Sequence, residues 1–378
     1  MPAVVFVPKE SQPREQRVAA TPETVRQYVR NGLEVRVERG AGERALFTDA
    51  DYEAAGATIE PAPIWSAADL VLKVSPPGED EASAMKEGSL LIAFMAANRN
   101  LGIVRTLVRR RVTVLAMELI PRTTKAQPMD ALSSQASIAG YKAVVVAAAK
   151  LPKYFPLLMT AAGTIKPAKV VIMGAGVAGL QAVATAKRLG AVVEVSDIRE
   201  AVKEQVESLG GKFIELPMQE SGEGAGGYAR EMGEDFLRRQ REIVSRHVAH
   251  ADVVVTTAQI PGKKAPVLVT REMVDGMRRG SIVVDLAVDS GGNCELSQPD
   301  REIEHGGVLV IGNSNFPAET AHDASTLYAR NVQALLLYLL HEGAVRLDLD
   351  DEITAGSTLV HDGAVRHSPT AALLEGGR

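Results

Sequence analysis

The segment Val170-Val-Ile-Met-Gly174-Ala-Gly176-Val-Ala-Gly179-Leu180 decides the fold. Its four apolar residues predict a buried strand, the glycines predict a tight turn, and the residues after Gly176 predict the start of a helix. A second strand, Val192-Val-Glu-Val195, follows that helix and ends just before Asp197. This βαβ pattern, with its glycines and later acidic residue, is typical of a dinucleotide-binding unit.

Each glycine has its own predicted task. Gly174 allows the tight turn, Gly176 lets the backbone approach a pyrophosphate, and Gly179 lets helix and strand pack closely. Amide groups at the helix start then face the phosphates. Asp197 would accept hydrogen bonds from the adenosine ribose hydroxyls and repel a 2′-phosphate, which predicts NAD(H) as the cofactor. Arg199 leaves NADP(H) as an alternative, because a nearby cation can receive that phosphate.

The composition limits the classes of protein to consider. With 378 residues the chain exceeds what one hydrophobic core usually serves, so we expect two domains. Its 46% hydrophobic and 24% charged residues are typical of a soluble globular protein, and the net charge of −5 argues against nucleic acid as a partner. A single cysteine, Cys294, fits a reducing compartment, so we expect the cytoplasm.

Membrane insertion and metal binding are not expected. The longest apolar runs fall well short of the roughly 20 residues that cross a bilayer. Among the seven histidines, His247 and His250 lie three residues apart, but no further ligand accompanies them.

Short β-branched runs alternate with helical patterns along most of the chain, which indicates parallel strands with crossover helices. We therefore predict two doubly wound, Rossmann-like α/β domains with mainly parallel sheets, joined by two long helices at residues 133–151 and 318–341. The predicted domains are an N-terminal one of residues 1–132, completed by 322–378, and an NAD(H)-binding Rossmann domain of residues 133–321. The polar segment 121–135 would then lie at the cleft between them.

Beyond the glycine motif, ordered short motifs run through most of the chain. They are Pro8-Lys-Glu10, Gln16 to Pro22, Val37 to Gly42, Leu72-Lys-Val74, Ala139 to Val144, Thr160 to Thr164, Lys203 to Phe213, Thr256 to Gly262 and Asp285 to Asn293. In this order they resemble the alanine dehydrogenase and nicotinamide nucleotide transhydrogenase superfamily, from about residue 1 to 345. The resemblance implies a nicotinamide-dependent oxidoreductase.

Within the superfamily, the segment Arg122-Thr-Thr-Lys-Ala-Gln127-Pro-Met-Asp130-Ala-Leu-Ser133-Ser134 is decisive. It resembles a loop of proton-translocating transhydrogenases that reads Arg-Ile-Ser-Arg-Ala-Gln-Ser-Met-Asp, followed by Leu-Ser-Ser. The resemblance implies that Arg122, Asp130 and Ser133 orient the nicotinamide carboxamide and nearby cofactor groups. It also implies that Gln127 reaches the nicotinamide ribose and the nucleotide on the partner component. The alternative is a polar linker in which Ser133 and Ser134 only cap the next helix.

Four positions of this segment depart from the family loop, and their contacts remain open. They are Thr123, Thr124, Lys125 and Pro128. Lys125 keeps the positive charge but lacks the planar fork of arginine, and Pro128 stiffens the backbone.

The chemistry separates the two branches of the superfamily. Alanine dehydrogenases lack the loop and use a histidine where this chain has Phe94. Oxidising an amino acid moves protons as well as a hydride and needs an acid or base, whereas transfer between two nicotinamide rings needs only close geometry and exclusion of water. Arg17, Lys73 and Asp289 match carboxylate-binding and catalytic places of alanine dehydrogenase, and we interpret them as retained ancestry or structural ion pairs.

Further positions match nucleotide-contacting places of transhydrogenases. A packing role is an equal alternative for Val177 and Gln240, and a backbone contact is the alternative for Gln259, where the family often has leucine. Tyr228 would lie in a loop that closes over the adenine side. The whole set is Val177, Asp197, Ile198, Arg199, Gly227, Tyr228, Gln240 and Gln259.

Taken together, the resemblance implies the NAD(H)-binding subunit of a Re/Si-specific, proton-translocating NAD(P)+ transhydrogenase. Such a subunit passes hydride from NADH to NADP+ on a separate NADP(H)-binding component, and membrane-spanning subunits couple the transfer to proton movement. It would be a homodimer, cytoplasmic and attached peripherally to the membrane through the complex. The alternatives are an alanine dehydrogenase-like amino-acid oxidoreductase and a non-catalytic NAD(H)-sensing module.

Overall fold

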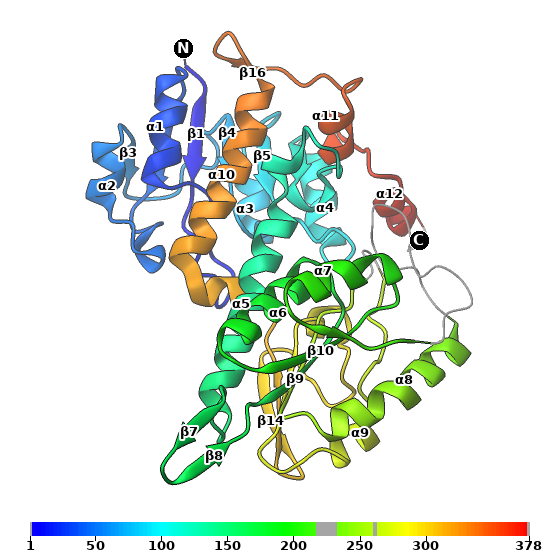
Figure 1. Ribbon diagram of the computed structural model, residues 1–378. Coiled ribbons are helices and arrows are strands. Elements are labelled where there is room, and N and C mark those ends of the chain that lie inside the picture. The colour runs from blue at the N-terminus through cyan, green and yellow to red at the C-terminus, as the bar shows by residue number, and fades with distance from the viewer. Residues whose placement is uncertain (1, 217–232, 260–262, 376–378) are drawn as a thin grey trace. The chain divides into compact units, whose positions relative to one another are not determined.

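The computed structural model describes residues 2–216, 233–259 and 263–375. The chain divides into two compact units (Figure 1). The first unit consists of Met1–Gln135 and Pro317–Arg378, and the second is the continuous stretch Ala136–Phe316.

An eight-stranded sheet forms the centre of the first unit, as far as this unit is described, in the order β19-β18-β6-β5-β4-β1-β2-β3. Strands β1 to β6 are parallel to their neighbours, whereas β18 and β19 are antiparallel and follow the second unit in sequence. The strands are β1 (Val4–Val7), β2 (Glu34–Glu38), β3 (Thr58–Glu60), β4 (Leu70–Leu72), β5 (Leu90–Ala93), β6 (Thr113–Ala116), β18 (Thr358–His361) and β19 (Ala364–Val365).

Helices cover both faces of this sheet, because alternate residues of its strands enter two separate apolar clusters. At the first helix, the Thr24 hydroxyl accepts a hydrogen bond of 3.0 Å from the Thr21 amide, which is the task of Glu or Gln in a capping box. The helices are α1 (Pro22–Arg30), α2 (Asp49–Ala54), α3 (Glu79–Ala84), α4 (Leu101–Arg109), α10 (Ala321–Leu339), α11 (Glu352–Ser357) and α12 (Ser368–Glu375), with short 3-10 turns η1 (Glu43–Ala45), η2 (Met117–Leu119) and η3 (Gln127–Met129). A small hairpin of β16 (Leu340–His341) and β17 (Ala344–Val345) follows α10.

The described part of the second unit has its own sheet, in the order β11-β10-β9-β12-β13-β15-β14. Its strands pair in parallel except β14, an antiparallel edge strand that the sequence patterns did not predict. Alternate residues of β9 again enter two clusters, so both faces are buried. The strands are β9 (Lys169–Met173), β10 (Val192–Ser196), β11 (Lys212–Phe213), β12 (Val253–Thr256), β13 (Ile282–Asp285), β14 (Arg301–His305) and β15 (Val308–Gly312).

The helices of the second unit connect these strands as crossovers. They are α6 (Val177–Arg188), α7 (Lys203–Ser208), α8 (Glu234–Ala249) and α9 (Arg271–Asp275), with 3-10 turns η4 (Glu200–Val202) and η6 (Val288–Ser290). A hairpin of β7 (Leu158–Thr160) and β8 (Gly163–Ile165) projects from the rest of this unit (Figure 1). The predicted fold class of two Rossmann-like α/β domains with mainly parallel sheets is confirmed.

The chain passes between the units at two places. The first lies inside α5 (Ala131–Lys150), which begins two residues earlier than the predicted helix. The second lies in the 3-10 turn η7 (Phe316–Thr320), which occupies the start of the segment predicted as one helix over 318–341.

Candidate functional site

The glycine turn between β9 and α6 is shaped by close backbone contacts. Gly174 has φ of 101°, and a Cβ there would lie 2.7 Å from Thr257 Oγ1, whose hydroxyl donates a 2.9 Å hydrogen bond to the Gly174 carbonyl. A Cβ on Gly179 would clash with that same carbonyl. Both positions therefore need glycine for reasons internal to the fold.

Gly176 differs from the other two glycines. A Cβ added to it would meet no atom within 4 Å, so the space beside this backbone is open. Gly176 also precedes the twelve-residue helix α6, whose first residue, Val177, is 40% exposed. The first amides of a helix have no partners within it and carry the positive end of its dipole. An anionic group can therefore approach the chain at this point.

Asp197 follows β10 and is nearly buried. Its carboxylate accepts a 2.6 Å hydrogen bond from the Ala175 amide. Three donors of Arg199 also bind it, the backbone amide at 2.8 Å, Nε at 2.9 Å and Nη2 at 2.8 Å. These four donors match the roughly four lone-pair sites of a carboxylate. A ribose diol would therefore have to displace Arg199 in order to bind Asp197.

The other predicted nucleotide contacts are dispersed. Ile198 is half-buried beside Asp197. Gln240, on α8, is 3% exposed, and among the described residues its side-chain carbonyl has no hydrogen-bond partner. Gln259 is exposed and donates a 3.1 Å hydrogen bond from Nε2 to the Leu286 carbonyl. Gly227 and Tyr228 lie outside the described residues.

The loop after β12 is held by Asp285 and Asn293, which sequence reasoning included only as part of a family motif. Asp285 is fully buried and accepts hydrogen bonds from the Asn293 amide at 2.8 Å and the Ser297 hydroxyl at 2.6 Å. Asn293 donates from Nδ2 to the carbonyls of Ala258 and Pro266, and its Oδ1 accepts from the Ala258 amide. This network fixes the backbone that faces Gly174. An aspartate ending an apolar strand was the available signal.

In the first unit, the loop 122–133 is anchored by apolar side chains and presents polar ones. Ala126 and Met129 are 1% and 4% exposed and belong to the core. Arg122 and Gln127 are exposed. The turn η3 places Gln127 between the two buried residues. The loop is thus folded onto its unit, with Arg122 and Gln127 on its outer side.

Asp130 and Ser133 are bound to each other at the start of α5. The Asp130 carboxylate accepts hydrogen bonds from the Ser133 amide at 2.9 Å and the Ser133 hydroxyl at 2.6 Å. Asp130 therefore caps the helix, and Ser133 acts as the donor instead of the cap that the linker interpretation expected. Ser134 donates to Asn331 Oδ1 at 2.7 Å.

Two departures from the family loop now have contacts. Lys125 Nζ donates a 2.8 Å hydrogen bond to the Tyr338 hydroxyl. The Pro128 carbonyl accepts one of 2.7 Å from Asn331 Nδ2. Both partners lie on α10.

A buried ionic cluster surrounds Arg17 and Lys73. Arg17 donates to Glu15 from Nε and Nη2, at 2.8 and 2.7 Å. Lys73 is fully buried, and its Nζ lies 3.2 Å from Glu10 Oε2 and 3.3 Å from Glu81 Oε2. Within the described residues neither Lys73 contact has hydrogen-bond geometry. Burial raises the pKa of Glu10, and the charge of Lys73 opposes that shift. Both cations therefore face carboxylates of this chain.

Phe94 occupies the place of the alanine dehydrogenase histidine. Its ring packs against that of Tyr328, with centroids 5.2 Å apart. The next two amides, of Met95 and Ala96, donate to the buried Glu118 carboxylate at 3.0 and 2.7 Å. Burial raises the pKa of Glu118. An apolar ring thus stands where amino-acid oxidation would place an imidazole.

Neither a metal centre nor a membrane span is found in the described residues. In that part of the chain, three or more histidine, cysteine or carboxylate side chains do not gather into a metal-binding group. Among the same residues, no helix combines the length and the apolar character needed to cross a bilayer.

Comparison with known proteins gives consistent matches over most of the chain. A relative from Rhodospirillum rubrum named as NAD(P) transhydrogenase subunit alpha is 48% identical over 374 residues, covering 96% of this chain and 97% of the relative. A solved transhydrogenase structure from Sinorhizobium meliloti is 45% identical and covers 96% of this chain and 99% of its own, with a TM-score of 0.87. A solved L-alanine dehydrogenase is 28% identical, covers 99% of each chain and has a TM-score of 0.83.

The sequence profile described as Alanine dehydrogenase/PNT, N-terminal domain, matches residues 6–139, and the profile of the corresponding C-terminal domain matches residues 143–368. Together these matches include nearly every element described above. The chain therefore belongs to the alanine dehydrogenase/PNT family.

Proposed function

We propose that this chain is the NAD(H)-binding subunit of a Re/Si-specific, proton-translocating NAD(P)+ transhydrogenase. It passes hydride from NADH to NADP+ bound on a separate component, and the membrane part of the complex couples this transfer to proton translocation. Relatives named NAD(P) transhydrogenase subunit alpha, at 48% and 43% identity, support the proposal.

The observation that carries the proposal is the loop 122–133. Its two apolar residues, Ala126 and Met129, are buried, while Arg122 and Gln127 are exposed. A plain linker does not need a core anchor on each side of an exposed amide. A loop that orients a nicotinamide for a second nucleotide needs both a rigid base and outward-facing polar groups.

The residues of the second unit fit a nicotinamide dinucleotide. The open backbone at Gly176 and the start of α6 suit a pyrophosphate, and Asp197 suits the adenosine ribose. When bound, the reduced nicotinamide supplies the hydride. The task of the chain is to bind the dinucleotide, orient the ring through Arg122, Asp130 and Ser133, and exclude water. Phe94 fits this task, because hydride transfer between two such rings requires no proton carrier.

The second candidate is an alanine dehydrogenase-like amino-acid oxidoreductase. The buried cations Arg17 and Lys73 favour it, because they suit a small carboxylate. Phe94 and the paired carboxylates Glu15 and Glu10 weigh against it. The family includes both types of enzyme, so an assay must separate them.

The proposal includes a homodimer, located in the cytoplasm and attached to the membrane through its partner subunits. The β7–β8 hairpin supports the dimer. Met159 and Ile165 on its strands are 73% and 44% exposed, and the preceding Leu157 is 54% exposed. A monomer would leave this apolar group in water.

Reconstitution tests the function. The chain is mixed with the NADP(H)-binding component of a transhydrogenase, and direct hydride transfer from NADH to an oxidised nicotinamide analogue is followed by absorbance. We expect transfer with both components present and none with either alone.

Two further measurements separate the alternatives. Robust NAD-linked turnover of L-alanine would establish the oxidoreductase instead. If Gln127→Asn left transfer at the wild-type rate, the sensing module would become the better account, since the proposal expects a large loss.

A further inference from the structure

One face of α10 holds the loop segment at three points. Ala324, Asn331 and Tyr338 are spaced by seven residues, which places them on the same side of the helix, about 10 Å apart along its axis. The Ala324 carbonyl accepts from Gln135 Nε2 at 3.1 Å. Asn331 binds the Pro128 carbonyl and the Ser134 hydroxyl. The segment therefore runs antiparallel to α10.

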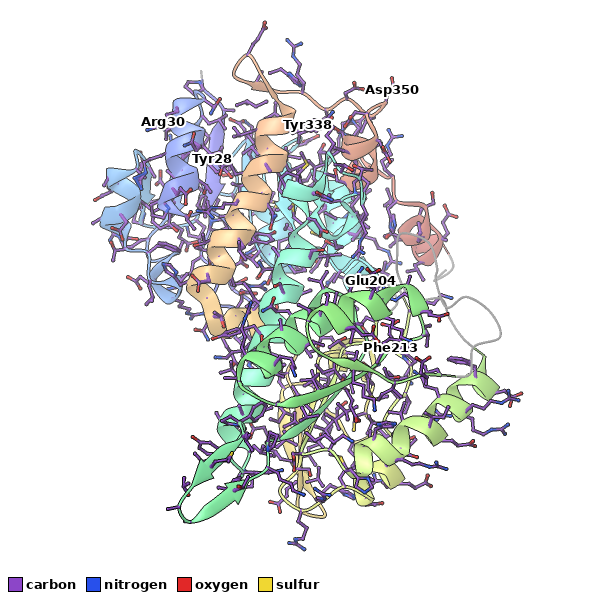
Figure 2. The ribbon with its side chains drawn as sticks, viewed as in Figure 1. Tyr28, Arg30, Glu204, Phe213, Tyr338 and Asp350 are labelled. Carbon is purple, nitrogen blue, oxygen red and sulfur yellow. The ribbon has the colours of Figure 1, made fainter. Side chains whose placement is uncertain are left out.

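The third point, Tyr338, is the middle of a chain of polar contacts. Lys125 Nζ lies 2.8 Å from the Tyr338 hydroxyl and 4.6 Å from the centre of its ring. The Tyr338 hydroxyl donates to Asp351 Oδ1 at 2.6 Å. Asp351 Oδ2 in turn accepts from the Thr354 amide at 2.8 Å and caps α11. Figure 2 labels Tyr338 on α10.

The entry to the loop also meets the C-terminal segment of the first unit. Gly356 of α11 lies so close to Pro121 that an added Cβ would be 3.3 Å from Pro121 Cδ. The helix capped by Asp351 thus contacts the residue just before Arg122. Lys125 and Asp351 therefore connect both sides of the loop's first half to that segment.

These contacts are too exposed to contribute much to folding. Lys125 is exposed, and Tyr338 and Asp351 are half-buried, so water and salt weaken their attraction. Their effect is geometric: they fix the backbone between Pro121 and the buried Ala126. Without them, the loop would be anchored only from Ala126 onward, and the stretch from Arg122 to Lys125 would move.

We infer that Lys125, Tyr338 and Asp351 are positioning residues for hydride transfer, acting through Arg122 and Gln127. The inference rests on the proposed function. It also explains why this chain tolerates a lysine where the family loop has arginine, since the tyrosine hydroxyl needs one donor and no planar fork.

The test compares Tyr338→Phe, Lys125→Met and the double variant in the reconstituted transfer assay. Each single variant removes one partner of the Lys125–Tyr338 bond, and we expect the transfer rate to fall about tenfold from misplacement of the loop. The NADH dissociation constant, measured by fluorescence, should stay within about twofold, because loop orientation and dinucleotide affinity are separate. The double variant should lose no more than either single one.

Controls separate positioning from stability. Lys125→Arg retains a donor and should keep most of the rate, whereas Tyr154→Phe removes a hydroxyl from a tyrosine that is 49% exposed in the second unit and should change nothing. Thermal unfolding shows whether a variant is merely less stable, and the Lys125→Arg and Lys125→Met pair remains decisive in that case.

The outcomes distinguish the two ideas. If the wild-type chain transfers hydride and Tyr338→Phe and Lys125→Met do so equally fast, the positioning role is wrong. If the wild-type chain transfers none, the proposed function itself fails. A fall in rate with additive losses in the double variant would also overturn the inference, since independent effects do not describe one bond.

Discussion

At the scale of single residues, Asp197 links the fold to the choice of cofactor. The carboxylate binds the Ala175 amide inside the glycine turn, so it also supports the backbone that faces the pyrophosphate. Three further bonds come from Arg199. Acid and base therefore compete for the same ribose position, with the acid dominant for NADH and the base for a 2′-phosphate.

Replacing this carboxylate should change both affinity and preference. In Asp197→Ala the ribose loses its acceptor, so we expect NADH to bind about tenfold more weakly, as for a lost charged hydrogen bond. Arg199 loses its paired carboxylate, so NADPH should bind more tightly than to the wild type. Fluorescence titration with both nucleotides measures the ratio. Glu204→Ala, an exposed site on α7 labelled in Figure 2, is the control, and an unchanged NADH-to-NADPH ratio in Asp197→Ala would contradict the role.

At the scale of elements, the β9–α6 turn provides a matched pair of substitutions. A methyl group at Gly176 meets open space, whereas one at Gly179 clashes with the Gly174 carbonyl. Both glycines belong to one motif, yet one position is limited by a ligand and the other by the protein.

We therefore expect opposite defects. Gly176→Ala should unfold at nearly the wild-type temperature but bind NADH at least about tenfold more weakly, because the methyl group occupies the approach of the pyrophosphate. Gly179→Ala should be destabilised by several kcal/mol, as for other forced backbone clashes. Thermal unfolding and NADH titration of both variants provide the comparison. Tight NADH binding by Gly176→Ala would show that the pyrophosphate lies elsewhere.

The same elements show what a sequence can predict. Continuous apolar runs bounded by glycine predicted the central strand β9, because a strand buried on both faces has no polar alternation. The edge strand β14 reads Arg-Glu-Ile-Glu-His and lacks that signal. The Asp285–Asn293 network and the α10 contacts of the loop 122–133 depend on residues far apart in sequence. Local patterns do not encode such partners.

At the scale of the whole molecule, the β7–β8 hairpin should control association. We expect the wild-type chain to be a dimer by light scattering and Met159→Lys to shift it toward monomer, because a charge would be buried at the contact. Leu46→Lys, at a site 76% exposed in the first unit, should leave the mass unchanged. A monomeric wild type, or a Met159→Lys dimer of unaltered affinity, would remove the hairpin from the interface.

The sheet of the first unit takes β18 and β19 from residues 358–365, far along the chain from its other strands. A ribosome makes these strands only after the entire second unit, which is continuous and can fold as it emerges. During that interval β6 is an open edge, a template for wrong pairing. We expect the nascent chain to rely on chaperones until β18 and β19 are translated, so that termination before them yields insoluble protein with an intact nucleotide-binding half.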